Sequence, residues 1–355
     1  MKPTDPARPQ DPNNQRRPKL APLSKVTKSD KPPIDLQQEL SQAGSSTQTV
    51  AKFFSQELSN QNVEIESILG KGSQATVYLA RYKPTNEKIA LKKVFVQDKN
   101  ELLCLQRELL SLSTCVHPNV LRCFGARVSP EQVLISLEYM DWGTLRYFIE
   151  NEPKGIPEVV VSIIVWQVLK GLAFLHKEKK TIHRDIKPSN LLLNRQGEVK
   201  IADFGIARQV GGTEGQANTF LGTMMYMSPE RLNGKEYQMN CDIWALGLVA
   251  YECALGRYPG FDDPKKATLL DLRRMFTDNK LTHFPQHFSD KFKSFLACCL
   301  QVEFKERAKA ADLLEHPFVK QAKKIDQGLF PAWLETVVNK ALHMQKKEKG
   351  AQQSK

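Results

Sequence analysis

The sequence lacks the closely spaced cysteine pairs that build zinc sites and disulfide frameworks. Its seven cysteines are scattered through apolar runs, and none belongs to a C-x-x-C motif, so neither kind of site is predicted. No signal-peptide core follows the first methionine, and the longest apolar stretch, 159–175, is interrupted by Gln167 and Lys170. Such a stretch is too polar for a spanning helix. We therefore expect a reducing compartment, no membrane span and a cytoplasmic location.

A concentrated stripe of positive charge is also missing. The formal net charge is +12, but eight of these charges lie in residues 1–62 and 320–355. Charged tails more often keep a protein soluble or dock a partner than read bases. We therefore expect no nucleic acid among the partners.

The order of predicted elements indicates an α+β fold in two lobes. Residues 1–62 are rich in Pro, Gln, Ser and Lys, and we expect a mostly disordered arm there. Apolar-rich runs split by turn residues then predict an antiparallel sheet, and longer helical patterns dominate after Gly143. Strands are expected at 64–69, 76–80, 88–94 and 132–139, and helices at 101–112, 159–176 and 242–255. A small β-rich lobe thus precedes a larger helical one.

A glycine-rich turn, Gly70-Lys71-Gly72-Ser73, separates the first two predicted strands. Glycine lets backbone N–H groups approach phosphate oxygens that a Cβ would hold away. The third glycine of the phosphate-binding pattern is replaced by Ala75, and a plain hairpin turn is the alternative interpretation. The motif alone therefore indicates phosphate binding only weakly.

The next strand strengthens that interpretation. In Ile89-Ala90-Leu91-Lys92 the side chains of Ala90 and Lys92 share one face of a strand. A small residue leaves room for a nucleotide ring, and an ammonium on the same face can reach the phosphates. Lys92 needs an anionic partner, and Glu108 on the following helix is the best candidate, with Glu101 as a less favoured one. The alternative is an ordinary solvated strand lysine.

The most specific segment is residues 183–190, with the sequence His-Arg-Asp-Ile-Lys-Pro-Ser-Asn. Phosphoryl transfer requires a carboxylate that accepts a hydroxyl proton, a cation that offsets phosphate charge, and oxygen ligands for magnesium. Asp185, Lys187 and Asn190 supply these groups in that order.

A short hairpin is expected directly after this segment. Residues 191–193 and 199–202 flank a turn and are predicted to pair as strands, so that the two ends of the hairpin are Asn190 and Asp203. Pairing the strands would bring two oxygen ligands side by side. Asp203 begins an Asp-Phe-Gly motif, in which the carboxylate binds the metal and glycine permits a sharp turn.

Over residues 63–319 the chain resembles the eukaryotic protein kinase family. The resemblance implies a bilobal fold, the cofactors ATP and Mg²⁺, and serine/threonine specificity from Lys187. It also implies a hinge from Glu138 to Asp141 behind Leu137, and an ion pair between Glu230 of a Ser-Pro-Glu motif and Arg307. The ATP-binding residues that it implies are Leu69, Gly70, Lys71, Gly72, Ser73, Val77, Ala90, Lys92, Glu108, Glu138 and Met140. Asp185 and Lys187 would be catalytic, and Asn190 and Asp203 would bind the metal.

Residues 220–232, Phe-Leu-Gly-Thr-Met-Met-Tyr-Met-Ser-Pro-Glu-Arg-Leu, are similar to the MAP kinase kinase subfamily. That subfamily is dual-specific and carries a docking peptide before the kinase domain. The resemblance therefore implies a MAP kinase as substrate and an upstream activating kinase. The candidate docking residues are Arg16, Arg17, Lys19, Leu20 and Leu23. Their leucine spacing departs from the usual pattern, and chance similarity is the alternative.

The same resemblance predicts activating phosphorylation at Thr213 and Thr219. The spacing of animal members would select Gly215, which has no hydroxyl, whereas the two threonines match the plant-type spacing. Regulation at Thr219 alone is the alternative. Thr223 is expected to support Asp185 and Lys187 rather than to be a regulatory site.

Residues 320–355 are expected to form a helical extension and a basic tail. Apolar residues recur at helical spacing from Phe330 to Leu342, which predicts an amphipathic helix over 330–345. It is expected to pack on the large lobe, and docking of an upstream kinase is the alternative. Two other functions remain open on the sequence: a pseudokinase scaffold, and a serine/threonine kinase of another family such as the Ste20-like group.

Overall fold

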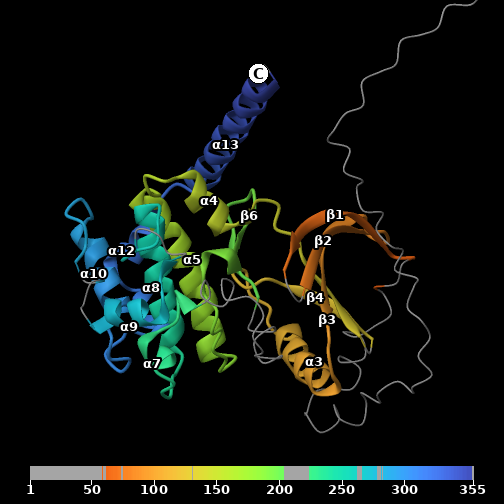
Figure 1. The fold of residues 1–355 in the computed structure, drawn as a ribbon, viewed down its shortest axis with the longest axis horizontal. Helices are drawn as coiled ribbons and strands as arrows, with labels where there is room; N and C mark the ends of the chain where they lie inside the picture. The colour runs from red at the N-terminus through yellow and green to blue at the C-terminus, as the bar shows by residue number, and fades with distance from the viewer. Residues whose placement is uncertain are drawn as a thin grey trace, which may run out of the picture.

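The computed structural model describes residues 58, 61–72, 75–129, 131–203, 224–261, 266–277, 281 and 283–353. These residues form two lobes, a sheet with one helix and a larger helical body (Figure 1). The expected bilobal α+β architecture is confirmed.

The small lobe is a five-stranded antiparallel sheet in the order β1-β2-β3-β5-β4. Its helix begins after Asp98, whose side chain accepts from the Glu101 N–H at 2.9 Å, as expected of an N-cap. The helix packs Leu105 and Leu109 against the sheet. The bounds are β1 Val63–Lys71, β2 Ala75–Tyr82, β3 Glu87–Phe95, α3 Lys99–Ser113, β4 Cys123–Ser129 and β5 Gln132–Glu138.

Two central helices, α5 and α8, form the core of the large lobe. The end of α8 is Gly256, whose left-handed φ of +71° closes the helix at no steric cost. The bounds are β6 Gly143–Thr144, α4 Leu145–Asn151, α5 Glu158–Lys177, η3 Pro188–Asn190, β7 Leu191–Leu193, β8 Val199–Ile201, α7 Pro229–Leu232, α8 Asn240–Leu255, α9 Leu269–Thr277, α10 Asp290–Cys299, α11 Ala310–Leu313, α12 Pro317–Lys320, η6 Gln321–Lys324 and α13 Leu329–Gln353.

The predicted strands, helices and short hairpin are confirmed, and β4 is an additional strand that the sequence pattern did not indicate. Helix α5 is long and apolar enough to meet a length and composition test for a membrane span, but 78% of the tested window is buried in the protein. It serves as a core helix of the large lobe. All seven cysteines are free.

The final helix is longer than expected, and its first half packs on the large lobe. Phe330, Leu334 and Val337 are buried in the same core as α5 and α8. Trp333 lies against Phe148 of α4, with ring centroids 5.9 Å apart. Packing on the chain's own lobe is thus confirmed. Beyond Ala341 the apolar face is exposed, and α13 projects from the body (Figure 1).

Truncation of Leu334 to alanine should therefore destabilise the protein. This side chain is fully buried, and Leu→Ala changes in cores cost about 2–5 kcal/mol. Leu342→Ala is the matched control on the same helix, because Leu342 is 48% exposed and should change stability by at most about 0.5 kcal/mol. Urea denaturation compares the two variants. Equal midpoints would show that α13 contributes no packing energy.

Candidate active site

The loop that carries Asp185 is held in place by a buried carboxylate. Asp242, near the start of α8, accepts from the backbone N–H groups of His183 and Arg184, both at 2.8 Å. His176 of α5 contacts the same carboxylate at 2.8 Å. Burial alone would raise the pKa of Asp242, but the hydrogen bond and charge of His176 lower it below its usual value. Asp242 is therefore ionised and fixes the backbone of the loop.

The fixed loop includes a backbone strain and a neutral histidine. Arg184 has a φ of +71°, a region that costs a non-glycine residue free energy unless its surroundings impose it. Burial lowers the pKa of His183, so its ring is neutral, and Nε2 donates to the Ala202 carbonyl at 3.0 Å. This bond joins the catalytic loop to the residue before Asp203.

The Asp185 carboxylate is oriented by its two predicted companions. Lys187 Nζ lies 2.9 Å from Asp185 Oδ2, and the Asn190 amide donates to the same oxygen at 3.0 Å. A second bond joins this amide to the Asp185 carbonyl at 2.8 Å. The catalytic candidates Asp185 and Lys187 are thus neighbours in space, and the amide donors of Asn190 are used, which leaves its oxygen for another partner.

The metal-binding candidates lie at the two ends of the predicted hairpin. Strands β7 and β8 pair in register, and the Ala202 N–H donates to the Asn190 carbonyl at 2.8 Å. Asn190 and Asp203 are thereby brought together, as expected from the spacing.

Buried amides anchor this hairpin to the large lobe. Gln167 of α5 donates to the Gly197 carbonyl at 2.8 Å and accepts from the Val199 N–H at 2.9 Å. Asn119 donates to both Gln167 and the Val199 carbonyl, at 3.0 and 2.9 Å. Neither amide is predicted from the sequence to have a role, although a lone glutamine in an apolar helix is a signal of such a buried bond.

The residues present fit a divalent metal that is shared with phosphates. Among the described residues, no group of three or more His, Cys, Asp and Glu side chains could hold a metal ion by itself. One carboxylate, Asp203, and one amide oxygen, Asn190, stand together at the hairpin ends. Magnesium is commonly bound by one or two such groups and completes its shell with water and substrate phosphates.

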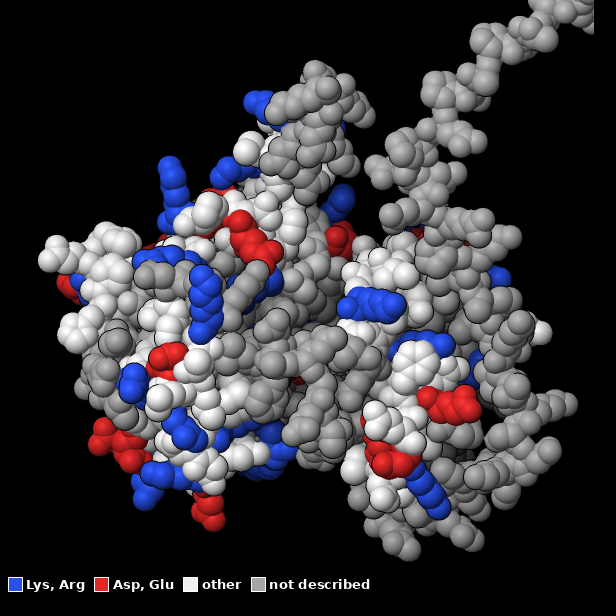
Figure 2. Space-filling model, in the orientation of Figure 1, with Lys and Arg blue, Asp and Glu red and all other residues white. Residues whose placement is uncertain are grey.

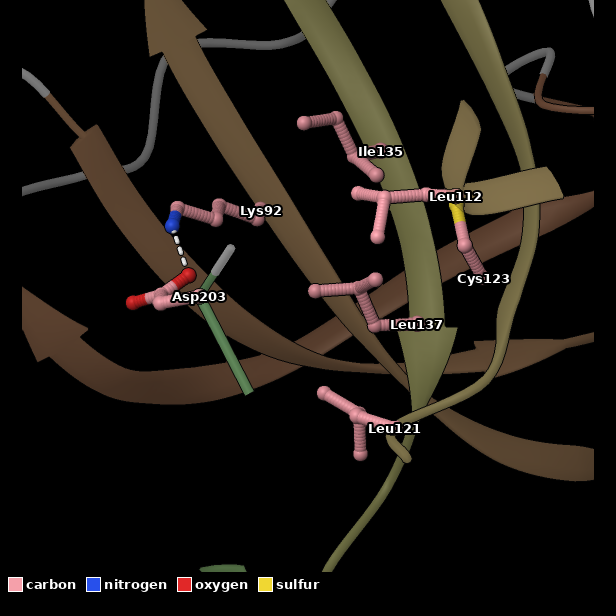
Figure 3. A pocket seen from close by; sticks show the side chains of 7 residues that line it. All are labelled: Lys92, Leu112, Leu121, Cys123, Ile135, Leu137 and Asp203. Atoms are coloured by element: carbon pink, nitrogen blue, oxygen red, sulfur yellow. Dashed lines mark hydrogen bonds and ion pairs between the residues drawn. The ribbon is translucent and has the colours of Figure 1, made fainter. Parts of the chain in front are cut away.

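The amine of Lys92 is paired with Asp203 (Figure 3). Burial would raise the pKa of Asp203, but the adjacent positive charge of Lys92 lowers it below its usual value. Lys92 is buried in the wall of a small pocket. The other residues that line this pocket are Leu112, Leu121, Cys123, Ile135, Leu137 and Asp203.

The expected pairing of Lys92 with Glu108 is not made in this structure. Asp203 pairs with the Lys92 ammonium, and the positive charge that acts on Glu108 is that of Arg184. Oxygen Oε2 of Glu108 is buried without a hydrogen-bond partner among the described residues. The alternative partner Glu101 is not the one that Lys92 contacts either: Lys92 pairs with Asp203, and the Glu101 carboxylate accepts from the Gln97 N–H just before α3.

Most of the other nucleotide-binding candidates lie on strands β1, β2 and β3. Ala90 and Lys92 lie two apart on β3, and Lys92 is opposite Val77 of β2. A Cβ at Gly70 would meet no atom within 4 Å, whereas Gly72 closes a turn through its N–H bond to Ala75 O at 2.8 Å. Leu69 and Lys71 are exposed beside Gly70, and Met140 is buried against Leu121 and Ala202.

Two ion-pair clusters of the large lobe involve residues that follow the predicted phosphorylation sites in the sequence. Arg307 pairs with Glu230 through two bonds of 2.8 and 3.0 Å, as the resemblance implied. Burial would raise the pKa of Glu230, but Arg307 lowers it. A second cluster was not foreseen: Arg146 of α4 donates to Glu252 of α8 at 2.7 Å and to the Tyr226 hydroxyl at 2.6 Å.

Comparison with known proteins agrees with the geometry of the site. The protein kinase domain description matches residues 63–319. The chain belongs to the protein kinase family. This family uses ATP and a divalent metal, the two groups that the site accommodates.

Curated relatives place this kinase within the family. It is 38% identical to mitogen-activated protein kinase kinase 1c of Physcomitrium patens, over 78% of this chain and 81% of that protein. Identity to mitogen-activated protein kinase kinase 2 of Arabidopsis thaliana is also 38%, over 74% of each chain. A dual specificity mitogen-activated protein kinase kinase of Drosophila melanogaster is 36% identical, over 75% of this chain and 73% of that protein. The kinase is of the MAP kinase kinase type.

Some predicted residues of the kinase lie outside the described ranges. They are Ser73, Thr213, Thr219, Thr223 and the docking candidates Arg16, Arg17, Lys19, Leu20 and Leu23.

On the face in view in Figure 2, basic and acidic side chains of the described residues are interspersed, without a continuous basic track.

The partly buried carboxyl of Glu108 should make the stability of the kinase depend on pH. Burial raises its pKa from 4.5 to about 7, partly offset by Arg184. The folded state then binds this proton more tightly than the unfolded state, so this group reduces stability as the pH rises through that window. Glu108→Gln removes the charge and should raise the Tm at about pH 8, with a much smaller gain at about pH 5.5.

Thermal scans of the nucleotide-free protein at both pH values measure this difference. Glu131→Gln, which changes an exposed carboxylate, controls for the loss of one negative charge. A Tm gain for Glu108→Gln of equal size at both pH values would contradict a raised pKa.

Proposed function

We propose that this kinase activates a MAP kinase by transferring the γ-phosphate of Mg·ATP to a threonine and a tyrosine of its substrate. The observation that carries the proposal is the convergence of Asp185, Lys187, Asn190 and Asp203 around the ends of one hairpin. The curated relatives named as MAP kinase kinases support the substrate class. We also propose a cytoplasmic location, which the seven free cysteines support.

Each group at the site has a distinct part in the reaction. Asp185 accepts the proton of the substrate hydroxyl, and the Asn190 amide and Lys187 ammonium hold its carboxylate in place. Lys187 also offsets the negative charge on the transferred phosphate. Asn190 and Asp203 would hold Mg²⁺, which neutralises phosphate charge when bound.

Lys92 is expected to change partner during this reaction. In the structure its ammonium is paired with Asp203. When a metal ion engages Asp203, Lys92 would turn toward the α- and β-phosphates, and Glu108 is the carboxylate on α3 that can then support it. The buried oxygen Oε2 of Glu108, which has no hydrogen-bond partner among the described residues, would gain one through this movement. A pseudokinase reading has no support from the residues, since the proton acceptor and both metal-ligand candidates are present together.

The test is an assay with purified, catalytically inactive MAP kinase as substrate. Wild-type protein, activated by an upstream kinase, should add phosphate to both the threonine and the tyrosine of a T-x-Y loop. Asp185→Asn should lower the rate by about 10²–10⁴, the usual cost of losing general-base catalysis. Asp203→Ala should abolish transfer because it removes a metal ligand. Phosphosite mapping supplies the readout, and phosphate on serine or threonine elsewhere would favour another kinase family.

The proposal includes activation by phosphorylation of Thr213 and Thr219. These residues lie between Asp203 and Glu230 in the sequence, and a phosphate adds about −1.5 to −2 charge that can pair with arginine and order a loop. Activity after treatment with an upstream kinase should fall strongly in the Thr213→Ala/Thr219→Ala double variant. Full activation of the double variant would refute the switch. Full activation of Thr213→Ala alone would reduce it to Thr219.

A further inference from the structure

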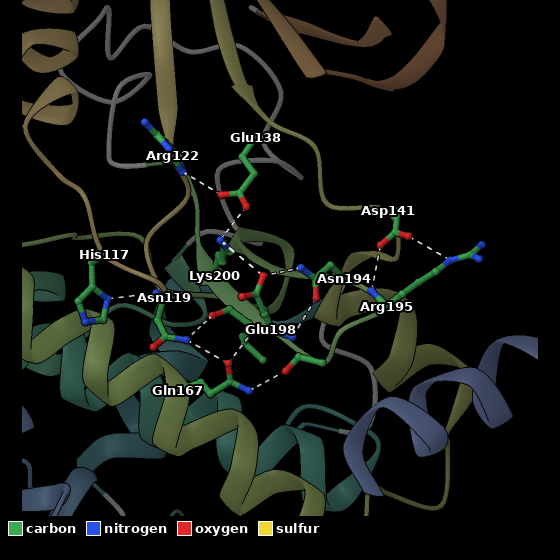
Figure 4. Close-up of polar contacts among 12 residues, drawn as sticks. His117, Asn119, Arg122, Glu138, Asp141, Gln167, Asn194, Arg195, Glu198 and Lys200 are labelled. Atoms are coloured by element: carbon green, nitrogen blue, oxygen red, sulfur yellow. Dashed lines mark hydrogen bonds and ion pairs between the residues drawn. The ribbon is translucent and has the colours of Figure 1, made fainter. Parts of the chain in front are cut away.

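Two acidic side chains of the predicted hinge turn toward the hairpin that carries the metal ligands (Figure 4). Glu138 Oε1 lies 2.7 Å from Nζ of Lys200 on β8. Asp141 Oδ2 lies 3.0 Å from Nε of Arg195 in the hairpin turn. The hinge, which carries the ATP-binding candidates Glu138 and Met140, is thus joined by side chains to the strand that leads to Asp203.

The two ion pairs differ in burial, and the more buried pair joins the hinge to the hairpin more strongly. The side chain of Lys200 is 10% exposed and that of Glu138 is 24% exposed. Arg195 is 72% exposed, and exposed pairs contribute little because water screens them. A buried ammonium that loses its carboxylate is strongly unfavourable. The pair between Glu138 and Lys200 is therefore the strong link.

This partly buried pair crosses between the lobes. Glu138 is the last residue of β5 and is opposite Ile89 of β3, the strand that carries Lys92. Lys200 is on β8 of the large lobe, three residues before Asp203. On the other side Lys200 approaches Glu198 at 3.7 Å, and Glu198 accepts from Asn194 at 2.6 Å. A chain of polar contacts therefore runs from the hinge to the turn of the metal hairpin.

We propose that Glu138 and Lys200 are positioning residues that fix the spacing between the hinge and Asp203. A nucleotide bound at both ends, by its base at the hinge and by its metal-bound phosphates at Asp203, requires that spacing. The link contributes to binding only when both ends are engaged. The inference rests on the ATP-dependent part of the proposed function and not on the identity of the protein substrate.

Binding of ADP to the full-length protein tests this inference without measuring catalysis. Displacement of a fluorescent ADP analogue gives the Kd with and without Mg²⁺ for wild type, Lys200→Met, Lys200→Arg and Arg195→Met. Lys200→Met should weaken Mg·ADP binding about tenfold, the usual size of coupling between contacting groups. Its effect without Mg²⁺ should be clearly smaller. Lys200→Arg should restore most of the affinity because it keeps the ion pair.

Arg195→Met is the matched control, since it removes the exposed pair on the same hairpin and should leave the Kd unchanged. Because Lys200 and Glu138 act as one pair, Glu138→Gln/Lys200→Met should bind Mg·ADP no worse than Lys200→Met alone. The Tm of every variant is measured in parallel.

Three results would overturn the inference: a lower Tm for Lys200→Met with an unchanged Kd, an equal loss of affinity with and without Mg²⁺, or additive effects in the double variant. If wild-type protein itself bound no Mg·ADP, the proposed function would fail instead. The two failures are therefore distinguishable.

Discussion

The catalytic apparatus depends on one buried carboxylate, Asp242. It accepts two backbone N–H bonds from the loop that carries Asp185 and a third bond from His176. A buried charge is tolerated in a protein only when hydrogen bonds replace its lost hydration. Here those bonds come from His176 of α5 and from the loop backbone, which is strained at Arg184. Asp242 of α8 therefore ties the geometry of the loop to the packing of the two central helices.

Around that fixed loop, buried polar contacts set the positions of the reacting groups. Asn119 and Gln167 attach the metal hairpin to the core, while α13 closes the opposite side of its turn. Gly197 shows how close that contact is: a Cβ there would lie 3.0 Å from Pro331, and its φ is +78°. The C-terminal helix is thus part of the support of the active site as well as an extension of the lobe.

The pairing of Lys92 illustrates why residue types alone do not fix an arrangement. One ammonium on β3 has carboxylates from two elements as possible partners, Glu108 on α3 and Asp203 after β8. Coulomb attraction favours whichever stands closer, and that is decided by how α3 and the hairpin are placed relative to the sheet. The half-buried Glu108 retains a raised pKa as the consequence. Local pattern cannot contain this information, because the three residues are far apart in the chain.

By itself the sequence determined the strands of the small lobe other than β4, the long helices α3, α5 and α8, the hairpin with Asn190 and Asp203 at its ends, and the roles expected of Asp185 and Lys187. Those features follow from local hydrophobic period, turn residues and short motifs, which act over a few residues. Only the tertiary structure decided the partner of Lys92, the buried bonds of Gln167 and Asp242, and the link from Glu138 to Lys200. Each of these joins residues remote in sequence, and burial gives them their strength because hydrogen bonds and charges in the interior have no water to replace a lost partner.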